Sequence, residues 1–222
     1  MVERVTGVIL DVDGTLVDSN LAHARAWAEV LRGSGYDVTV EQLWRLIGMG
    51  SDKLLPAAIG VEKDSAEGKR LTEQRKKLFL ERYLPELQPT RGARDLLERL
   101  RSAELRIGIA SSAEGEELEG LLAVCGASDL ADTTPPSDQV EGSKPEPDVV
   151  QAALRKLGQP ARDVLMLGDT PYDVEAAGRA GVGIIAVRCG GWSADDLGGA
   201  LAVYDDPADL LSDFATILRR SE

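Results

Sequence analysis

The sequence is poor in aromatic residues, cysteine and histidine. Aromatic side chains make up 4% of the 222 residues, and the chain has two cysteines and one histidine. Cys125 and Cys189 are far apart and form no CxxC pair, so no disulfide framework is indicated. We expect both thiols to be small core side chains rather than reactive groups. The 43% hydrophobic content must therefore build a core mainly from Leu, Val, Ile and Ala.

Long apolar runs and excess positive charge are lacking too. The longest apolar stretches have the length of a strand, far below the ~20 residues of a membrane span. With 25 basic and 38 acidic residues, the formal charge of −13 argues against nucleic acid and anionic membrane as main partners. Met1–Arg4 leads straight into an apolar strand without the layout of a signal peptide, so we expect a cytoplasmic protein.

Short apolar runs alternate with amphipathic segments along most of the chain. We predict buried parallel strands at Val5–Leu10, Leu105–Ala110, Val164–Leu167, Gly183–Val187 and Ala200–Tyr204. Helical spacing of apolar residues predicts helices at Ala93–Ser102, Glu146–Leu157, Tyr172–Ala180 and Ala208–Leu218. This alternation is typical of an α/β protein with a Rossmann-like open parallel sheet, in which ligands bind at the carboxyl ends of the strands.

One region breaks the alternation. Between Val17 and Leu87 no convincing strand is present, and the pattern predicts helices at Leu21–Leu31, Val40–Ile47 and Leu71–Leu84, with an exposed connection at Asp64–Arg70. A chain of 222 residues has room for a core plus an insertion. We therefore predict an α/β core formed by residues 1–16 and 88–222, and a helical cap formed by residues 17–87, inserted after the first strand over its carboxyl end.

Two aspartates follow the first predicted strand. Asp11 and Asp13 open the segment DVDGT, and side chains two positions apart in an extended chain point the same way. Carboxylates this close repel one another, so a site that keeps both ionised needs a cation beside them, and hard oxygen ligands favour Mg²⁺. The alternative is a solvated turn at the strand end, where Asp and Gly are common.

Groups able to bind an anion or a metal follow the later strands. Ser111 and Ser112 come after the second strand and can hold a phosphoryl oxygen, or cap the next helix. Lys144 lies at the mouth of a predicted helix, where it can neutralise an anion, or lie in a solvated loop. Asp169 ends another strand and Asp173 begins a helix; the two suit a metal site, or are acids favoured by the helix dipole alone.

The order and spacing of these groups resemble the four motifs of the haloacid dehalogenase superfamily. DVDGT at positions 11–15, Ser111, Lys144 before a proline, and Gly168-Asp169 followed by Asp173 carry the resemblance, which covers essentially the whole chain. The sequence is most similar to the phosphatases with a helical cap of the C1 type after the first strand, a group that includes phosphoglycolate phosphatase and β-phosphoglucomutase.

The resemblance implies a Mg²⁺-dependent phosphatase that acts on a small phosphate monoester through an aspartyl-phosphate. By similarity, Asp11 is the nucleophile, and Asp13 is the general acid and then the general base. Asp13 must then start protonated, and we expect its close carboxylate neighbour to help. The Mg²⁺ ion is expected to bind the Asp11 carboxylate, the backbone carbonyl of Asp13 and Asp169.

The resemblance also implies supporting roles. Ser111, Ser112 and Lys144 are expected to bind the non-bridging phosphate oxygens. Asp173 is expected to orient the ligands of the metal, and Thr15 to position the general acid.

Other functions stay open at this point. His23, the single histidine, resembles the cap-hinge histidine of β-phosphoglucomutase and favours a sugar phosphate mutase, whereas the Gly-Thr form at Thr15 favours a hydrolase. Lys53 lies where phosphonoacetaldehyde hydrolases carry a lysine nucleophile, but those enzymes and the true dehalogenases lack an acid at the position of Asp13. A non-catalytic phosphoacceptor module such as a receiver domain also uses an aspartate and Mg²⁺, but it is shorter and has no cap.

The substrate is not specified by the predicted cap. Arg45, Lys53, Lys76 and Lys77 can meet a second anionic group of the substrate, or form a solvated face. Phosphoglycolate, a sugar phosphate and a nucleoside monophosphate all fit. We expect a small phosphorylated metabolite as the partner, no nucleic acid or membrane, and a monomer or homodimer.

Overall fold

Short apolar segments pair into one parallel sheet in the computed structural model, which describes residues 5–129, 131 and 142–215. Within the described residues the strands are β1 (Gly7–Leu10), β2 (Arg106–Ile109), β3 (Val164–Gly168), β4 (Gly183–Val187) and β5 (Ala202–Tyr204). Their spatial order is β2-β1-β3-β4-β5. The chain therefore proceeds to one side of β1 first and then to the other, and such a switch point leaves a crevice at the carboxyl ends of the strands. The predicted α/β fold is confirmed.

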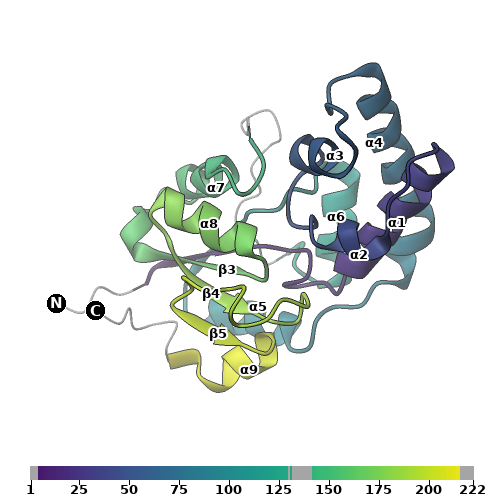
Figure 1. Ribbon diagram of the computed structural model, residues 1–222. Coiled ribbons are helices and arrows are strands. Elements are labelled where there is room, and N and C mark those ends of the chain that lie inside the picture. The colour runs from purple at the N-terminus through teal and green to yellow at the C-terminus, as the bar shows by residue number, and fades with distance from the viewer. Residues whose placement is uncertain (1–4, 130, 132–141, 216–222) are drawn as a thin grey trace.

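Alternation of side chains along the strands divides the core between the two faces of the sheet. Val8 and Leu10 pack into a cluster with α5 (Ala93–Ser102), α6 (Gly115–Val124) and α9 (Pro207–Ser212). Ile9 and Met166 pack on the opposite face with α7 (Asp148–Leu157) and α8 (Pro171–Ala180). Figure 1 shows α7 and α8 on one side of the sheet and α5 and α9 on the other.

A helical group lies beside the sheet and has its own apolar cluster (Figure 1). It consists of α1 (Asn20–Gly33), α2 (Val40–Trp44), α3 (Ser51–Ile59), α4 (Ala66–Leu78), the π-helical turn η1 (Phe79–Tyr83) and the 3₁₀ turn η2 (Leu84–Glu86). We call these elements the cap. The chain enters and leaves the cap through adjacent segments, because the Asp18 amide donates to the Gln88 carbonyl at 3.0 Å.

Several helix limits differ from the prediction. α3 was not predicted, and it contains Pro56, a residue that argues against a helix interior. α6 was not predicted either, because Gly115 and Gly120 lower its helix propensity. The expected exposed connection at Asp64–Arg70 is largely helical: Ser65 caps α4 by accepting a hydrogen bond of 2.9 Å from the Gly68 amide. The predicted helix Ala208–Leu218 is observed as α9, and its residues from 216 onward lie outside the described part.

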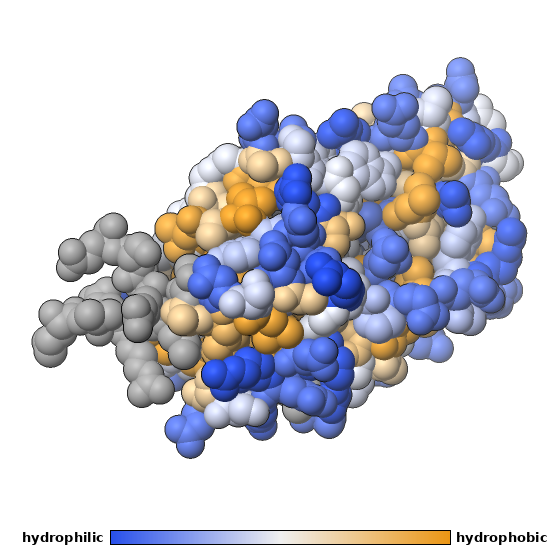
Figure 2. Space-filling view, turned by 90° about the horizontal axis from the view of Figure 1, so that it is seen from below, coloured by the Kyte–Doolittle hydropathy of each residue, from blue (hydrophilic) through white to orange (hydrophobic). Residues whose placement is uncertain are grey.

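Hydrophilic residues predominate on the face of the molecule seen in Figure 2, with hydrophobic residues interspersed among them. In the part of the chain that the structure describes, no helix has both the length and the apolar character needed to cross a bilayer.

Candidate active site

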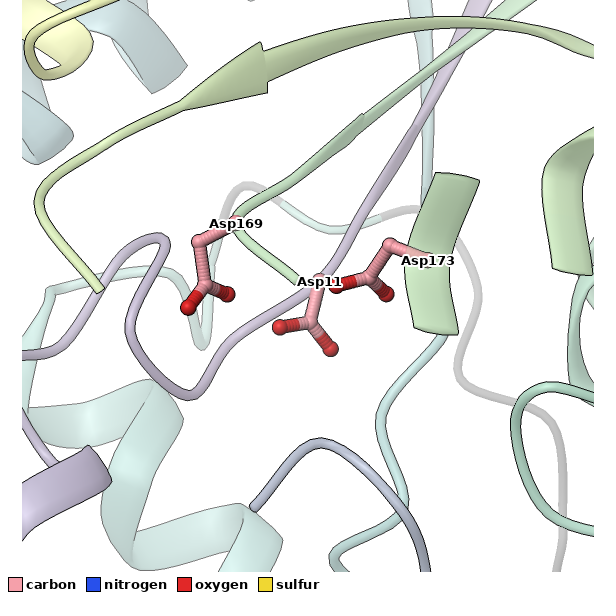
Figure 3. Close-up of side chains that lie close together, drawn as sticks. All are labelled: Asp11, Asp169 and Asp173. Atoms are coloured by element: carbon pink, nitrogen blue, oxygen red, sulfur yellow. The ribbon is translucent and has the colours of Figure 1, made fainter. Parts of the chain in front are cut away.

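Three aspartates come together where β1 and β3 end (Figure 3). Asp11 follows β1, Asp169 follows β3 and Asp173 lies in the first turn of α8; each offers a carboxylate oxygen, and these oxygens lie within 4.8 Å of one another. The parallel register pairs Leu10 with Leu167, which aligns the two strand ends. All three aspartates are buried, with at most 4% of their surface exposed. The predicted convergence of acidic strand ends is therefore present.

The ammonium group of Lys144 lies between two of these carboxylates. Its Nζ contacts Asp11 Oδ1 and is 2.7 Å from Asp173 Oδ1, and the side chain is 1% exposed. Asp173 Oδ2 accepts hydrogen bonds from the Thr170 amide at 3.0 Å and the Thr170 hydroxyl at 2.6 Å. Lys144 thus belongs to a buried polar site and not to a solvated loop.

Two side-chain donors hold Asp169. The Thr15 hydroxyl donates to Oδ1 at 3.0 Å, and the Asn20 amide group donates to Oδ2 at 2.8 Å. Thr15 was expected to position Asp13, but its hydroxyl instead contacts Asp169 and, at 3.5 Å, Asp11. Thr15 therefore supports the acidic cluster.

Glycine backbone closes around the same carboxylate. A Cβ atom at Gly14, whose φ is +75°, would lie 2.2 Å from Asp169 Oδ2, and one at Gly190 would lie 1.7 Å from it. The carbonyl of Gly190 also accepts a hydrogen bond of 3.1 Å from Asn20. A side chain at either glycine would displace Asp169, so both positions require glycine for this approach.

The acidic cluster carries more negative charge than Lys144 neutralises. Burial raises the pKa of Asp11 to about 7; Lys144 lowers it, and Asp173 and Asp13 raise it. Burial, with repulsion from Asp11 and Asp173, also holds the pKa of Asp169 well above its usual range. Buried carboxylate oxygens that repel one another at this spacing form a donor set suited to a divalent cation.

Asp13 has different surroundings from Asp11. Its Oδ1 accepts a hydrogen bond from the Ser19 hydroxyl at 2.6 Å and lies 2.6 Å from His23 Nε2. Burial alone would raise the pKa of Asp13, but His23, Ser19 and Arg75 outweigh it and hold that pKa below its ordinary value. The expectation that a neighbouring carboxylate keeps Asp13 protonated is therefore wrong for the protein without substrate, because a histidine, a hydroxyl and a guanidinium together stabilise its ionised form.

The two serines after β2 lie at the edge of the core facing the cap. Ser111 Oγ accepts a hydrogen bond of 3.0 Å from the Ala113 amide, and the Ser112 hydroxyl donates to the Gly48 carbonyl of the cap at 3.4 Å. The N-cap residue of α6 is Glu114, so neither serine caps that helix. Their hydroxyl groups are placed to meet a ligand in the cavity described next.

A cavity of about 720 Å³ lies between the core and the cap. Its wall includes Asp11, Asp13, Ser111, Ser112 and Ser143 from the core, and His23, Trp27, Met49, Lys63, Lys76 and Arg75 from the cap. Two acids with different surroundings, Asp11 of the acidic cluster and Asp13 beside His23, therefore line the same cavity.

Three of the basic cap residues that could meet the substrate, Arg45, Lys53 and Lys77, are not among the described residues that line this cavity. The Arg45 guanidinium lies 4.9 Å from the ring centres of both Trp44 and Trp192. The rings of Trp44 and Trp192 stack at 5.2 Å, which joins the cap to the loop after β4. Arg45 thus contributes to contact between cap and core, and Lys63 and Lys76 are the lysines on the cavity wall.

Sequence reasoning missed three polar residues of the site, Asn20, Arg75 and Glu117. Asn20 is the only asparagine in the chain, and a single asparagine forms no sequence pattern that would indicate a functional residue. Arg75 shares a helix face with the buried Leu71 and Phe79, at spacings of four residues. A charged residue on the apolar face of a helix is the sequence signal that could have found Arg75. Glu117, which is buried in α6, is a charged residue in a similar position.

Residues 8–187 match the family described as haloacid dehalogenase-like hydrolase. The chain belongs to this family, as the order of the motifs suggested. The phosphoglycolate phosphatase of Rhodospirillum rubrum is 32% identical over 215 residues, which cover 91% of this chain and 88% of that protein. The fructose-1-phosphate phosphatase YqaB of Escherichia coli strain K12 is 25% identical over 190 residues, covering 85% and 99%.

Solved structures show the same architecture. A hydrolase from Pseudomonas syringae aligns with a TM-score of 0.87 and 31% sequence identity, over 96% of this chain and 99% of that one. The similarity extends over the sheet and the cap together, so the predicted fold class, a parallel α/β core with an inserted helical cap, is confirmed.

Proposed function

We propose that this protein is a Mg²⁺-dependent phosphatase that hydrolyses a small phosphate monoester, with Asp11 as the nucleophile. The observation that carries the proposal is the buried cluster of Asp11, Asp169 and Asp173 around Lys144, next to a cavity that Asp13 also lines. Relatives named phosphoglycolate phosphatase and fructose-1-phosphate phosphatase support a phosphate ester as the substrate.

The reaction has two steps. A carboxylate oxygen of Asp11 forms a bond to phosphorus while the ester P–O bond breaks, and Asp13 gives its proton to the leaving alkoxide. Asp13 then takes a proton from water, which attacks the aspartyl-phosphate and releases inorganic phosphate and Asp11. Because a bound phosphate dianion repels the ionised form of Asp13, we expect substrate binding to raise the pKa of Asp13 and to bring the required proton.

The metal fits the acidic cluster. The carboxylates of Asp11 and Asp169 and the backbone carbonyl of Asp13 would hold the Mg²⁺ ion, and Asp173 would orient those ligands. When bound, the ion supplies positive charge that offsets repulsion between the anionic nucleophile and the phosphate.

The phosphate oxygens require donors as well. Lys144 Nζ contacts Asp11 Oδ1, so a phosphoryl group on Asp11 would lie within its reach. Ser111 and Ser112 offer hydroxyl groups on the cavity wall. We assign these three residues to the binding of the non-bridging oxygens.

One observation favours a sugar phosphate mutase as a second candidate. His23 of the cap lies 2.6 Å from Asp13, as the resemblance to the cap-hinge histidine of β-phosphoglucomutase implies. A mutase would return the phosphoryl group to a second hydroxyl of the sugar instead of to water.

A panel of phosphate esters, assayed with Mg²⁺ and ranked by kcat/KM, tests both candidates. We expect hydrolysis of p-nitrophenyl phosphate and of at least one small alkyl phosphate, and loss of turnover in Asp11→Asn and in EDTA. Isomerisation of glucose 1-phosphate faster than its hydrolysis would favour the mutase. Turnover that survives Asp11→Asn would overturn the proposal. No turnover of any ester would overturn it too, and would leave a phosphoacceptor module as the alternative.

Three further assignments stay predictions. We propose that the cap comprises residues 17–87, that the protein is cytoplasmic, and that it is a monomer or homodimer. Limited proteolysis between cap and core, fractionation of cells and analytical ultracentrifugation test them in turn.

A further inference from the structure

Arg75 of α4 and Glu117 of α6 form a buried ion pair between the cap and the core. Arg75 Nη1 donates to Glu117 Oε1 at 2.8 Å and to Oε2 at 2.7 Å. The side chains are 12% and 7% exposed. Charges this deeply buried destabilise a protein unless they are paired, so the Arg75–Glu117 pair holds only in the arrangement that brings α4 against α6.

The other end of the same guanidinium contacts the single histidine. Arg75 Nη2 lies against His23 Nδ1. A guanidinium has hydrogen-bond donors and no acceptor, so His23 Nδ1 must accept and cannot carry a proton. Nε2, the other ring nitrogen, is then the donor, and it lies 2.6 Å from Asp13 Oδ1, a carboxylate oxygen that accepts.

Packing fixes the plane of both groups. The His23 ring stacks on Phe79 with the ring centres 4.1 Å apart and the planes at 10°. The Arg75 guanidinium lies 4.9 Å from the Phe79 ring centre and 5.5 Å from that of Trp27. The histidine is therefore held in one tautomer and one orientation.

We propose that Arg75 and Glu117 are positioning residues for the acid–base group: Glu117 of the core orients Arg75, Arg75 fixes His23 as an Nε2–H donor, and His23 orients Asp13. The inference rests on the proposed phosphatase function. Because Arg75 and His23 belong to the cap while Glu117 and Asp13 belong to the core, the chain of contacts is complete only when the cap lies closed on the core. Asp13 is thus oriented for proton transfer at the moment when the cavity is enclosed.

The leaving group of the substrate gives the deciding measurement. An alkoxide needs a proton to depart, whereas p-nitrophenolate departs with little help, and kcat/KM reports the first step alone because that step is irreversible once the alcohol leaves. A residue that positions the general acid therefore affects an alkyl phosphate much more than p-nitrophenyl phosphate. A residue that only stabilises the fold or closes the cap affects both esters equally.

The double variant Arg75→Met/Glu117→Leu removes both charges together, so no unpaired charge stays buried. We expect kcat/KM for the best alkyl phosphate to fall by about 10–100-fold, and that for p-nitrophenyl phosphate by less than about 3-fold. The matched control is Arg70→Met/Glu67→Leu, an exposed pair in α4 joined at 2.7 Å, which should change neither value.

Arg75→Lys separates positioning from closure and serves if the double variant fails to fold. A lysine ammonium can keep the ion pair with Glu117, but it lacks the planar fork that reaches Glu117 and His23 together. We expect this variant to lose the alkyl ester selectively, as the double variant does. Equal losses for the two esters, or no loss, in Arg75→Lys would overturn the inference.

The tautomer can also be observed without turnover. Because the chain has one histidine, ¹⁵N-histidine labelling gives the signals of His23 alone. We expect the proton on Nε2 in the wild-type protein with Mg²⁺, and a mixture of tautomers in Arg75→Met/Glu117→Leu. A proton on Nδ1 in the wild type would overturn the inference. Failure of the wild type to hydrolyse any ester would instead overturn the proposed function, and the tautomer measurement would still decide the positioning.

Discussion

The side-chain amide of Asn20 donates a hydrogen bond of 2.8 Å to Asp169 Oδ2, although the two residues are 149 positions apart. Asn20 begins α1, the first helix of the cap, and Asp169 follows β3. The hydrogen bond favours the ionised form of Asp169: burial raises the pKa of this carboxyl, and the Asn20 and Thr15 donors act against it. The start of the cap therefore supports the acidic cluster directly.

We expect Asn20→Ala to weaken Mg²⁺ binding by about 10-fold or more, because a metal ligand must be deprotonated and Asp169 would lose a donor to its ionised form. Isothermal titration with Mg²⁺ and the Mg²⁺ dependence of turnover measure the effect. Gln151→Ala, which removes an exposed amide from α7, is the control. Unchanged Mg²⁺ affinity in Asn20→Ala would show that the hydrogen bond does not tune the site.

The stability of the metal-free protein should depend on the charge of Asp11. Burial raises the pKa of Asp11 from 3.8 to about 7, so its ionised form is disfavoured by folding. The resulting loss of stability is absent below pH 3.8, grows as the pH rises to about 7, and is constant above that. The substitution Asp11→Asn removes this pH-dependent loss of stability. Lys144 does not become an unpaired buried charge in the variant, because Asp173 remains its partner at 2.7 Å.

We therefore expect Asp11→Asn to be more stable than the wild type in EDTA at pH 8, by on the order of 2–4 kcal/mol, with the difference vanishing towards pH 4. Urea unfolding at several pH values measures it, with Asp95→Asn, an exposed acid on α5, as the control. Added Mg²⁺ should stabilise the wild type more than the variant. A wild type that gains stability over Asp11→Asn as the pH rises would contradict the burial argument.

Neither cysteine should react in the folded protein. Burial raises the pKa of the Cys125 thiol to about 11 and that of the Cys189 thiol to about 12, so the thiolate is rare near neutral pH. Iodoacetamide at pH 8 should leave both thiols unmodified by mass spectrometry and should leave activity unchanged, whereas both should react in urea. Rapid labelling of either cysteine in the folded protein would contradict this assignment.

The sheet and the acidic cluster could be predicted because both follow from local patterns. Buried parallel strands are continuous apolar runs, and their carboxyl ends meet at one edge of the sheet. The sequence therefore predicted that Asp11, Asp169 and Lys144 lie close together. The Arg75–Glu117 pair could not, because it depends on how the cap packs against the core, which no short segment encodes. The same reason explains why Arg45, which the sequence offered as a contact for the substrate or as part of a solvated face, instead lies over the stacked rings of Trp44 and Trp192.

Two helices escaped prediction for reasons of composition. α3 contains Pro56, and α6 contains Gly115 and Gly120. A Cβ atom at Gly120 would lie 2.4 Å from a methyl carbon of Leu84, so a larger residue at this position would require the Leu84 side chain to move.

The central claim is that Asp11 receives the phosphoryl group. Acid quenching during turnover of ³²P-labelled p-nitrophenyl phosphate with Mg²⁺, followed by peptide mapping, tests it most directly, because this leaving group needs little help from Asp13 in the first step. We expect label on the peptide that contains Asp11, more of it in Asp13→Asn because the second step lacks its base, and none in Asp11→Asn. Turnover with no labelled peptide in the wild type or in Asp13→Asn, or label on a different residue, would contradict the account.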